Sequence, residues 1–170
     1  MNIVLTGFMA TGKTAIGRAI VEKSRYRFED TDSMIVTDSG MEISEIFEKY
    51  GEEYFRELER KAVEKAAEAD GTVIATGGGV VLDKRNVEAL RKNGIIFNLD
   101  PDFAVIEERV GEARATRPLM KNDSMDEIRA RFESRKPFYD DCDYKIRIIK
   151  GRTPNSYAEE ILSIIEDRTK

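Results

Sequence analysis

The segment Gly7-Phe8-Met9-Ala10-Thr11-Gly12-Lys13-Thr14 matches the phosphate-binding loop pattern G-x-x-x-x-G-K-[ST]. A short apolar run typical of a buried strand precedes it, and apolar residues at helical spacing follow it. Strand, glycine loop and helix together aim backbone N–H groups and a helix N-terminus at a phosphate. The segment therefore predicts a nucleoside triphosphate site, in which Lys13 contacts the outer phosphates and the Thr14 hydroxyl binds Mg²⁺. A chance glycine turn is the alternative, which the flanking strand and helix argue against.

Length and composition indicate a single globular domain over residues 1–170. A chain of 170 residues with 41% hydrophobic residues can bury a core of its own. Its net charge of −5 argues against nucleic-acid and membrane partners, since both favour a basic surface. No apolar run reaches bilayer-spanning length and no signal-peptide pattern opens the chain, so we expect a cytoplasmic protein. Because histidine is absent, any general base is a carboxylate, a lysine or a tyrosine.

Predicted strands and helices alternate along the chain at short intervals. We predict strands at residues 3–5, 26–28, 72–76, 95–99 and 144–149. This order is typical of an α/β fold, a three-layer α/β/α domain with a central five-stranded parallel sheet.

Several helix ends are predicted from local signals. Asp100-Pro101 has the order of a cap residue followed by a proline at the first helical position, and so predicts a helix start. Ser124-Met125-Asp126-Glu127 is a capping box for another helix. Residues 111–123 hold few apolar side chains and include Arg117-Pro118, which disfavours helix at Arg117, so we predict a mobile lid there. A further helix, from residue 52 to about 69, is expected to bury Tyr54, Phe55, Leu58, Ala62 and Ala66.

Two carboxylates, Asp30 and Asp32, flank Thr31 at the end of the predicted second strand. Alternate residues of an extended strand share a face, so both are expected to point the same way. One would hold Mg²⁺ through water while the other orients a substrate hydroxyl or accepts its proton. Thr76 stands where phosphate-loop proteins usually have an aspartate, which leaves Asp30 as the best candidate for the metal. A helix cap or Asx turn is the alternative for this pair.

Three glycines and three arginines complete the candidate site. Gly77-Gly78-Gly79 follows the central strand at the edge where such sheets bind ligands, and would let backbone N–H groups approach a ligand closely. An ordinary turn is the alternative. Arg135 shares a helical face with apolar residues, so we expect it to point inward toward an anionic ligand or a structural ion pair. Arg56 and the lid residue Arg117 are further candidates, with solvated arginines as the alternative.

Together these segments resemble shikimate kinase, a small P-loop kinase of the nucleoside-monophosphate-kinase type, over nearly the whole chain. The resemblance rests on residues 7–14, 30–32, 46–56, 77–79, 117–119 and 135–139. It implies ATP-dependent phosphorylation of the 3-hydroxyl of shikimate, a step of chorismate and aromatic amino-acid biosynthesis, with Mg²⁺ as metal. It also implies a substrate-binding region at about residues 31–60. We expect a monomer with no nucleic-acid or membrane partner.

The resemblance also implies a role for each matching residue. Asp30 would act through Mg²⁺-bound water, and Lys13, Asp32 and Arg117 would be catalytic. Arg56 and Arg135 would bind the shikimate carboxylate as planar bidentate donors. The acceptor would also contact Asp32 and the backbone of Gly77, Gly78 and Gly79. The residues expected to bind the nucleotide are Gly7, Ala10, Thr11, Gly12, Lys13, Thr14, Ala15, Arg109, Arg117, Arg152 and Pro154.

The chain departs from the family pattern at a few positions. Ala10 stands where the family usually has glycine, Ile35-Val36 replaces a typical Ile-Glu pair, and the match around Arg109 is loose. One alternative is a kinase for another small acceptor, such as gluconate or a nucleoside monophosphate. A second is a nucleotide-dependent switch, although the guanine-reading Asn-Lys-x-Asp pattern is absent.

Overall fold

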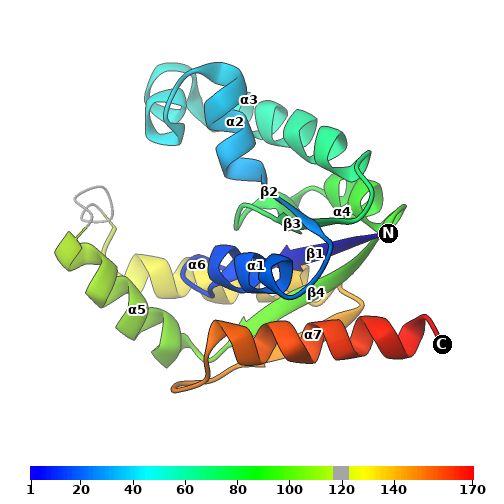
Figure 1. Cartoon of the computed structure of the whole chain (residues 1–170). Coiled ribbons are helices and arrows are strands. Elements are labelled where there is room, and N and C mark those ends of the chain that lie inside the picture. The colour runs from blue at the N-terminus through cyan, green and yellow to red at the C-terminus, as the bar shows by residue number, and fades with distance from the viewer. Residues whose placement is uncertain (117–122) are drawn as a thin grey trace.

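The computed structural model describes residues 1–116 and 123–170 and contains a five-stranded sheet. The strands are β1 (Asn2–Thr6), β2 (Arg27–Asp30), β3 (Thr72–Ala75), β4 (Gly94–Pro101) and β5 (Tyr144–Ile148). Their order is β2-β3-β1-β4-β5 and all four pairings are parallel, as predicted (Figure 1). The phosphate loop therefore leaves the central strand of the sheet, with β3 and β4 on either side.

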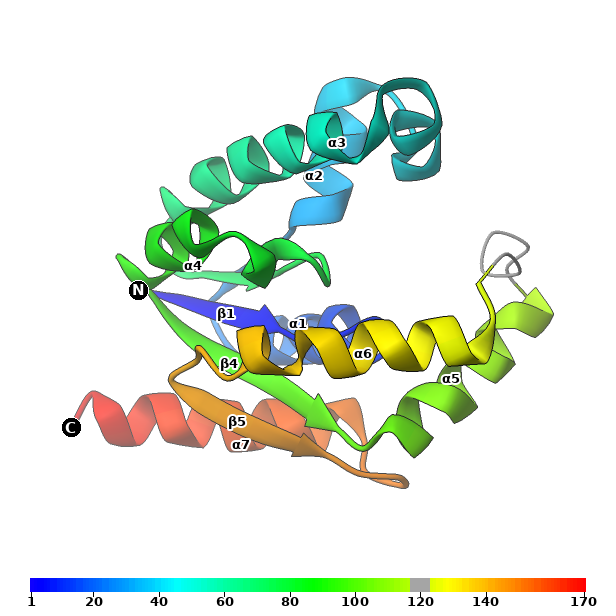
Figure 2. The ribbon, with the colours of Figure 1, turned by 180° about the vertical axis from the view of Figure 1, so that it is seen from behind.

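Helices cover both faces of this sheet, so the predicted three-layer architecture is confirmed. One face packs against α1 (Lys13–Glu22) and α7 (Pro154–Arg168). The other packs against α3 (Ile43–Ala67), α4 (Lys84–Arg91) and α6 (Met125–Tyr139), and Figure 2 shows α4 and α6 in front of β1. The remaining helical elements are α2 (Thr31–Ser39), the 3₁₀ turn η1 (Val80–Leu82) and α5 (Phe103–Thr116).

The burial of β1 explains why its sequence is continuously apolar. Successive side chains of a strand point to opposite faces. Val4 accordingly lies in the core beneath α3, α4 and α6, while Ile3 and Leu5 lie in the core beneath α1 and α7. All three are fully buried, as is typical of a parallel sheet covered on both faces.

Several helix boundaries lie at local sequence signals such as capping residues. The Ser124 hydroxyl accepts a hydrogen bond from the Glu127 N–H at 3.1 Å, so the predicted capping box starts α6. Asp83 caps α4 through the Arg85 N–H at 3.0 Å. Gly51 interrupts α3 with φ +83°, which lies outside the helical region. In the part of the chain that the structure describes, no helix is long and apolar enough to cross a membrane.

The predicted helix start at Asp100-Pro101 is wrong. Strand β4 continues through Pro101, which lies opposite Ile148 of β5, and α5 begins only at Phe103. The ladder with β5, a partner that lies far along the chain, extends the strand beyond the local stop signal. A proline at the end of a strand is compatible with this, because little pairing remains for its missing N–H.

The lid predicted at residues 111–123 is wrong for its first residues, 111–116, which are helical. Helix α5 continues through Gly111 to Thr116. Few apolar residues are needed at the end of a surface helix, where glutamate, alanine and arginine are good helix formers. The rest of the predicted lid, including Arg117, falls within residues 117–122, which lie outside the described residues.

The buried residues of α3 differ in part from the predicted stripe. Tyr54 is 44% exposed and stacks on Tyr50, whereas Phe55, Ala62 and Ala66 are buried as predicted. The stripe instead includes Glu59, which is only 2% exposed. A carboxylate therefore takes a core-facing position, and it faces the candidate site.

Candidate functional site

The phosphate loop adopts its compact shape through its own side chains. The Lys13 ammonium donates to the carbonyl oxygens of Gly7 and Phe8 at 2.7 and 2.8 Å, and the Thr11 hydroxyl donates to Phe8 at 2.9 Å. Burial lowers the pKa of Lys13 to about 8, against the opposing charges of nearby aspartates. Gly12 has φ +97° and caps the start of α1, so the loop ends at a helix N-terminus. This is the arrangement that binds a phosphate chain.

One loop residue departs from ideal backbone geometry. Ala10 has φ +61° and is the one non-glycine residue with positive φ in the described chain. The left-handed region costs an L-residue roughly 1–2 kcal/mol. The substitution of alanine for the usual glycine therefore places strain in the loop.

The Thr14 hydroxyl and the Asp30 carboxylate form the metal side of the site. Thr14 Oγ1 lies 3.2 Å from Asp30 Oδ2, while Asp30 Oδ1 accepts from the N–H groups of Asp32 and Ser33 at 3.0 and 3.1 Å. Asp30 is thus a helix cap, as the alternative interpretation expected, and still presents its other oxygen to Thr14. A hydroxyl beside one carboxylate suits Mg²⁺, which takes few protein ligands and keeps water and substrate phosphates. Within residues 1–116 and 123–170 no larger acidic cluster suited to a metal occurs.

The geometry predicted for Asp32 is wrong, although its location is right. Strand β2 ends at Asp30, and Asp32 lies in the first turn of α2, so the two side chains do not share a strand face. They remain close: burial and the neighbouring Asp30 raise the pKa of the Asp32 carboxyl, while Lys13 and Arg56 oppose this. Asp32 therefore faces the same space as the phosphate-loop lysine.

A side chain at Gly77 or at Gly79 would crowd a different neighbour, whereas one at Gly78 would make ordinary contacts. A Cβ at Gly77 would lie 2.6 Å from Asp32 Oδ1, and one at Gly79 would lie 2.2 Å from Arg56 Nη1. The backbone of Gly78 lies between the Arg135 guanidinium and the phosphate loop. The Gly77 N–H donates to the Thr31 hydroxyl at 3.0 Å. The turn is therefore where Asp32, the phosphate loop and the two arginines meet.

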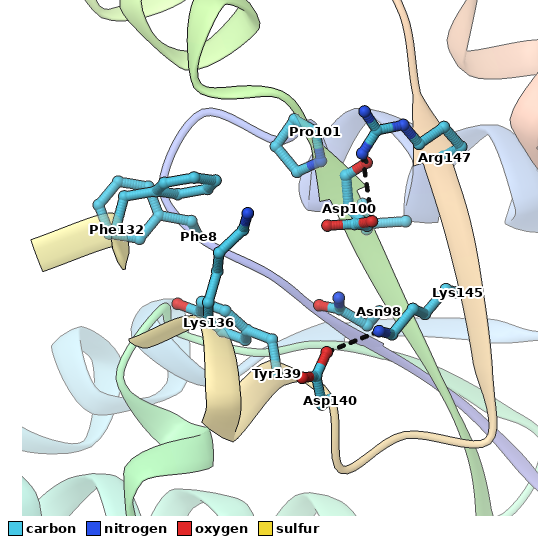
Figure 3. Close-up of a pocket in the computed structure, with 11 residues that line it drawn as sticks. Phe8, Asn98, Asp100, Pro101, Phe132, Lys136, Tyr139, Asp140, Lys145 and Arg147 are labelled. Carbon is cyan, nitrogen blue, oxygen red and sulfur yellow. Dashed lines mark hydrogen bonds and ion pairs between the residues drawn. The ribbon is translucent and has the colours of Figure 1, made fainter. Parts of the chain in front are cut away.

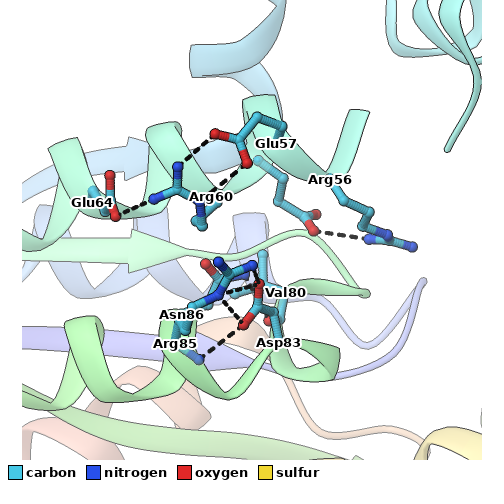
Figure 4. Close-up of polar contacts among 9 residues, drawn as sticks. Arg56, Glu57, Arg60, Glu64, Val80, Asp83, Arg85 and Asn86 are labelled. Atoms are coloured by element: carbon cyan, nitrogen blue, oxygen red, sulfur yellow. Dashed lines mark hydrogen bonds and ion pairs between the residues drawn. The ribbon is translucent and has the colours of Figure 1, made fainter. Parts of the chain in front are cut away.

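Arg56 is held by carboxylates, contrary to the alternative of a solvated arginine. Its Nη1 donates to Glu59 Oε1 at 2.8 Å and its Nη2 to Glu52 Oε1 at 3.3 Å. Figure 4 shows Arg56 with one carboxylate contact marked. Burial raises the pKa of Glu59, opposed by its hydrogen bond to Arg56. Glu59 was not predicted as a site residue, although it lies on the buried face of α3, four residues after Phe55 and three before Ala62. That spacing was the available signal.

Arg135 differs from Arg56 in forming no ion pair with a carboxylate in the part of the chain that the structure describes. Its guanidinium lies 6.0 Å from the Phe8 ring centroid, at the back of the phosphate loop. Among the described residues no ion pair includes it, so the structural ion pair expected as an alternative is not found there. A half-buried, unneutralised guanidinium near Lys13 can bind an anion.

The residues predicted for the adenine side meet at one cavity of about 580 Å³. Arg109 donates from Nη1 to the Ala10 carbonyl at 2.9 Å, which ties α5 to the phosphate loop. Arg152 lies over the Tyr157 ring at 4.3 Å and pairs with Glu160 at 2.6 Å. The other predicted residues that line this cavity are Ala10, Thr11, Gly12, Ala15 and Pro154.

A second cavity, of about 240 Å³, lies behind the loop and was not predicted (Figure 3). Phe8 and Phe132 form its aromatic wall and contact each other edge to face, with ring centroids 5.4 Å apart. Lys145 pairs with Asp140 at 2.6 Å within it. Tyr139 also lines this cavity, beneath the loop.

Comparison with known proteins gives one consistent result. A family profile described as shikimate kinase matches residues 9–166. The shikimate kinase of Thermoanaerobacter pseudethanolicus is 46% identical over 162 residues, covering 95% of this chain and 94% of that protein. The shikimate kinase of Caldicellulosiruptor bescii is 46% identical over 164 residues, covering 96% and 94%.

Solved structures agree with the sequence relatives. A shikimate kinase from Bacteroides thetaiotaomicron superposes with a TM-score of 0.88 at 31% identity, covering 98% of both chains. The shikimate kinase from Acinetobacter baumannii, solved in complex with shikimate, also has a TM-score of 0.88, at 30% identity, and covers 98% of this chain and 93% of that one.

Proposed function

The chain belongs to the shikimate kinase family, and from this premise we propose that it phosphorylates the 3-hydroxyl of shikimate with ATP. The products are shikimate 3-phosphate and ADP, and the reaction is a step of chorismate and aromatic amino-acid biosynthesis. The observation that carries the proposal is the meeting of a phosphate-loop lysine, Asp32 and an unneutralised Arg135 around one glycine turn. These groups match a phosphate donor, a hydroxyl and a carboxylate respectively.

ATP is the phosphoryl donor of this family. We propose that the backbone from Gly7 to Ala15 and the Lys13 ammonium bind its phosphates. The cavity beside Arg109, Arg152 and Pro154 has room for a base and ribose, and its volume of about 580 Å³ lies within the range of small-molecule sites.

Mg²⁺ is the proposed metal, with the Thr14 hydroxyl as a ligand and Asp30 acting through water. The 3.2 Å separation of Thr14 Oγ1 and Asp30 Oδ2 supports this pair. When bound, Mg²⁺ offsets negative charge on the phosphates. Asp30 holds its orientation because its other oxygen caps α2.

We propose that Asp32 holds the acceptor hydroxyl and accepts its proton. The Arg56 and Arg135 guanidinium groups, on either side of the glycine turn, would bind the acceptor carboxylate. Positioning and charge stabilisation supply most of the catalysis in a loose phosphoryl transfer, so little further covalent chemistry is required of the protein. The proposed role of Arg117 over the transferring phosphate belongs to residues outside the described ones.

We also propose that the protein acts as a monomer in the cytoplasm, without nucleic-acid or membrane partners. The net charge of −5 supports the absence of polyanionic partners. Light scattering after size exclusion measures the mass: 19.3 kDa is expected, and a multiple of it would contradict the monomer.

The function is tested by ADP release from Mg-ATP with shikimate, gluconate, quinate and nucleoside monophosphates as acceptors. Strong stimulation by shikimate alone is expected, and Lys13→Ala should abolish it while leaving the fold intact. Stimulation by another acceptor would keep the phosphoryl-transfer chemistry and assign a different acceptor specificity. An absence of stimulation by every acceptor would refute the kinase and favour a nucleotide-dependent switch.

A further inference from the structure

Tyr139 joins the helix that carries Arg135 to the glycine turn. It is the last residue of α6, it is 5% exposed, and its hydroxyl donates to the Gly78 carbonyl oxygen at 2.6 Å. Arg135 lies one helical turn earlier on the same helix, and its guanidinium is 3.7 Å from the position that a Cβ would take at Gly78. One tyrosine hydroxyl thus connects two parts of the proposed acceptor site that are 61 residues apart.

The hydrogen bond from Tyr139 fixes the orientation of a whole peptide unit as well as that of the carbonyl oxygen. The Gly78 carbonyl and the Gly79 N–H belong to one planar peptide unit, and the described chain contains no cis peptide bond. In a trans peptide these two groups point in opposite directions. A carbonyl held toward Tyr139 therefore turns the Gly79 N–H away from α6.

That N–H is a free donor. Within the described ranges, 1–116 and 123–170, no protein group accepts a hydrogen bond from it. The Gly79 Cα, to which this N–H group is attached, faces the Arg56 guanidinium, because a Cβ built on it would be 2.2 Å from Arg56 Nη1. Glycine is otherwise conformationally permissive, so a turn of three glycines needs an external constraint to keep one peptide in one orientation.

We propose that Tyr139 is a positioning residue for the acceptor. Its hydroxyl orients the Gly78–Gly79 peptide, so that the Gly79 N–H keeps one orientation in the turn that Arg56 and Arg135 contact. The proposal rests on the proposed function, since the acceptor is the hydroxy acid of that reaction. Tyr139 touches no reacting atom and acts through the turn and through Arg135, with which its hydroxyl shares a hydrogen bond. Burial raises its pKa to about 12, opposed by Arg135, so the hydroxyl stays protonated as a donor at neutral pH.

Tyr139→Phe removes the hydroxyl and keeps the ring. The KM for shikimate should rise about fivefold to thirtyfold, as expected when a buried hydrogen bond that orders a binding group is lost. The kcat and the KM for ATP should stay within about twofold, because the hydroxyl lies on the acceptor side. Misfolded protein would lower kcat and leave the KM for shikimate unchanged, so the split distinguishes positioning from stability.

Tyr144→Phe is the matched control. Tyr144 loses the same atom, stacks on Phe97 in β4 at a centroid distance of 5.2 Å, and lies outside the proposed site. Its kinetic constants should match those of the wild type. An unchanged KM for shikimate in Tyr139→Phe, or an equal rise in both KM values, would overturn the proposal.

A second readout separates this proposal from the function itself. In the free proteins, the NMR signal of the Gly79 amide should shift in Tyr139→Phe and should keep its wild-type position in Tyr144→Phe. An unaltered Gly79 amide would overturn the positioning role, whatever the acceptor. Wild-type protein that shows no response to shikimate would refute the function, while the amide result would still decide whether Tyr139 orients the turn.

Discussion

Replacing Gly79 by alanine tests the acceptor site with a single methyl group. Gly79 has φ −95° and ψ 0°, which alanine adopts without backbone strain. The added Cβ would lie 2.2 Å from Arg56 Nη1 and 2.8 Å from its Cζ and Nη2. Ordinary contact begins at 3.4 Å, so the guanidinium must retreat by about 1.2 Å. Because it is the end of a flexible side chain, the fold should accommodate the change while Arg56 leaves its place.

The kinetic consequence follows from that displacement. A misplacement of about 1 Å can cost about a hundredfold in rate, and a charge-assisted hydrogen bond contributes about 1.5–3 kcal/mol. We therefore expect kcat/KM for shikimate to fall about tenfold to a hundredfold, with the KM for ATP unchanged. The assay is coupled ADP release with each substrate varied in turn.

Gly111→Ala provides the control for this methyl group. Gly111 lies in α5, and a Cβ there would meet nothing within 4 Å. Alanine at this position should leave both KM values unaltered and stabilise the helix by roughly 0.5–1 kcal/mol. If Gly79→Ala retained wild-type kcat/KM for shikimate, Arg56 would not bind the acceptor and the reasoning from the glycine turn would fail.

Three further substitutions test other parts of the site. Arg135→Lys should raise the KM for shikimate about tenfold, because it removes the planar fork, and unaltered kinetics would make Arg135 structural. Ala10→Gly should raise the melting temperature by about 1–3 °C, since relief of the strain at φ +61° exceeds the entropic cost of glycine, and calorimetry showing a lower value would contradict this. Glu59→Gln should gain stability over the wild type as pH rises above about 4.5, because burial raises the folded pKa of Glu59 and the unfolded chain ionises first; a difference in melting temperature that does not grow between pH 4 and 7 would refute it.

Much of the fold was predictable because short-range and long-range signals agree. The phosphate loop, the apolar strands and the capping box are each local, and alternation of strands and helices fixes a parallel sheet. Prediction failed at Asp100-Pro101, where pairing with β5 extends a strand through a local helix-start signal. That pairing depends on a strand more than forty residues later, so no local pattern contains it.

The candidate site was predictable to the extent that strand ends determine it. The ends of β1, β2 and β3 meet at one edge of the sheet, which brings the loop, Asp30 and the glycine turn together. The burial of charged side chains was harder to predict from the sequence. Glu59 and the position of Tyr54 depend on how α3 packs over the sheet, and an assumed stripe of purely apolar residues includes Tyr54 and leaves Glu59 out.

The glycine turn needs partners from several elements to keep one conformation. A turn of three glycines can approach ligands closely, but its flexibility would spread its N–H groups over many orientations. The Thr31 hydroxyl accepts from Gly77, and Tyr139 holds the carbonyl of Gly78. Arg56 fills the space that a side chain at Gly79 would take, and Glu59 in turn holds Arg56. Rigidity comes from side chains outside the turn, so substitutions that leave every glycine in place, at Tyr139 or Glu59, should alter acceptor binding as surely as substitutions within it.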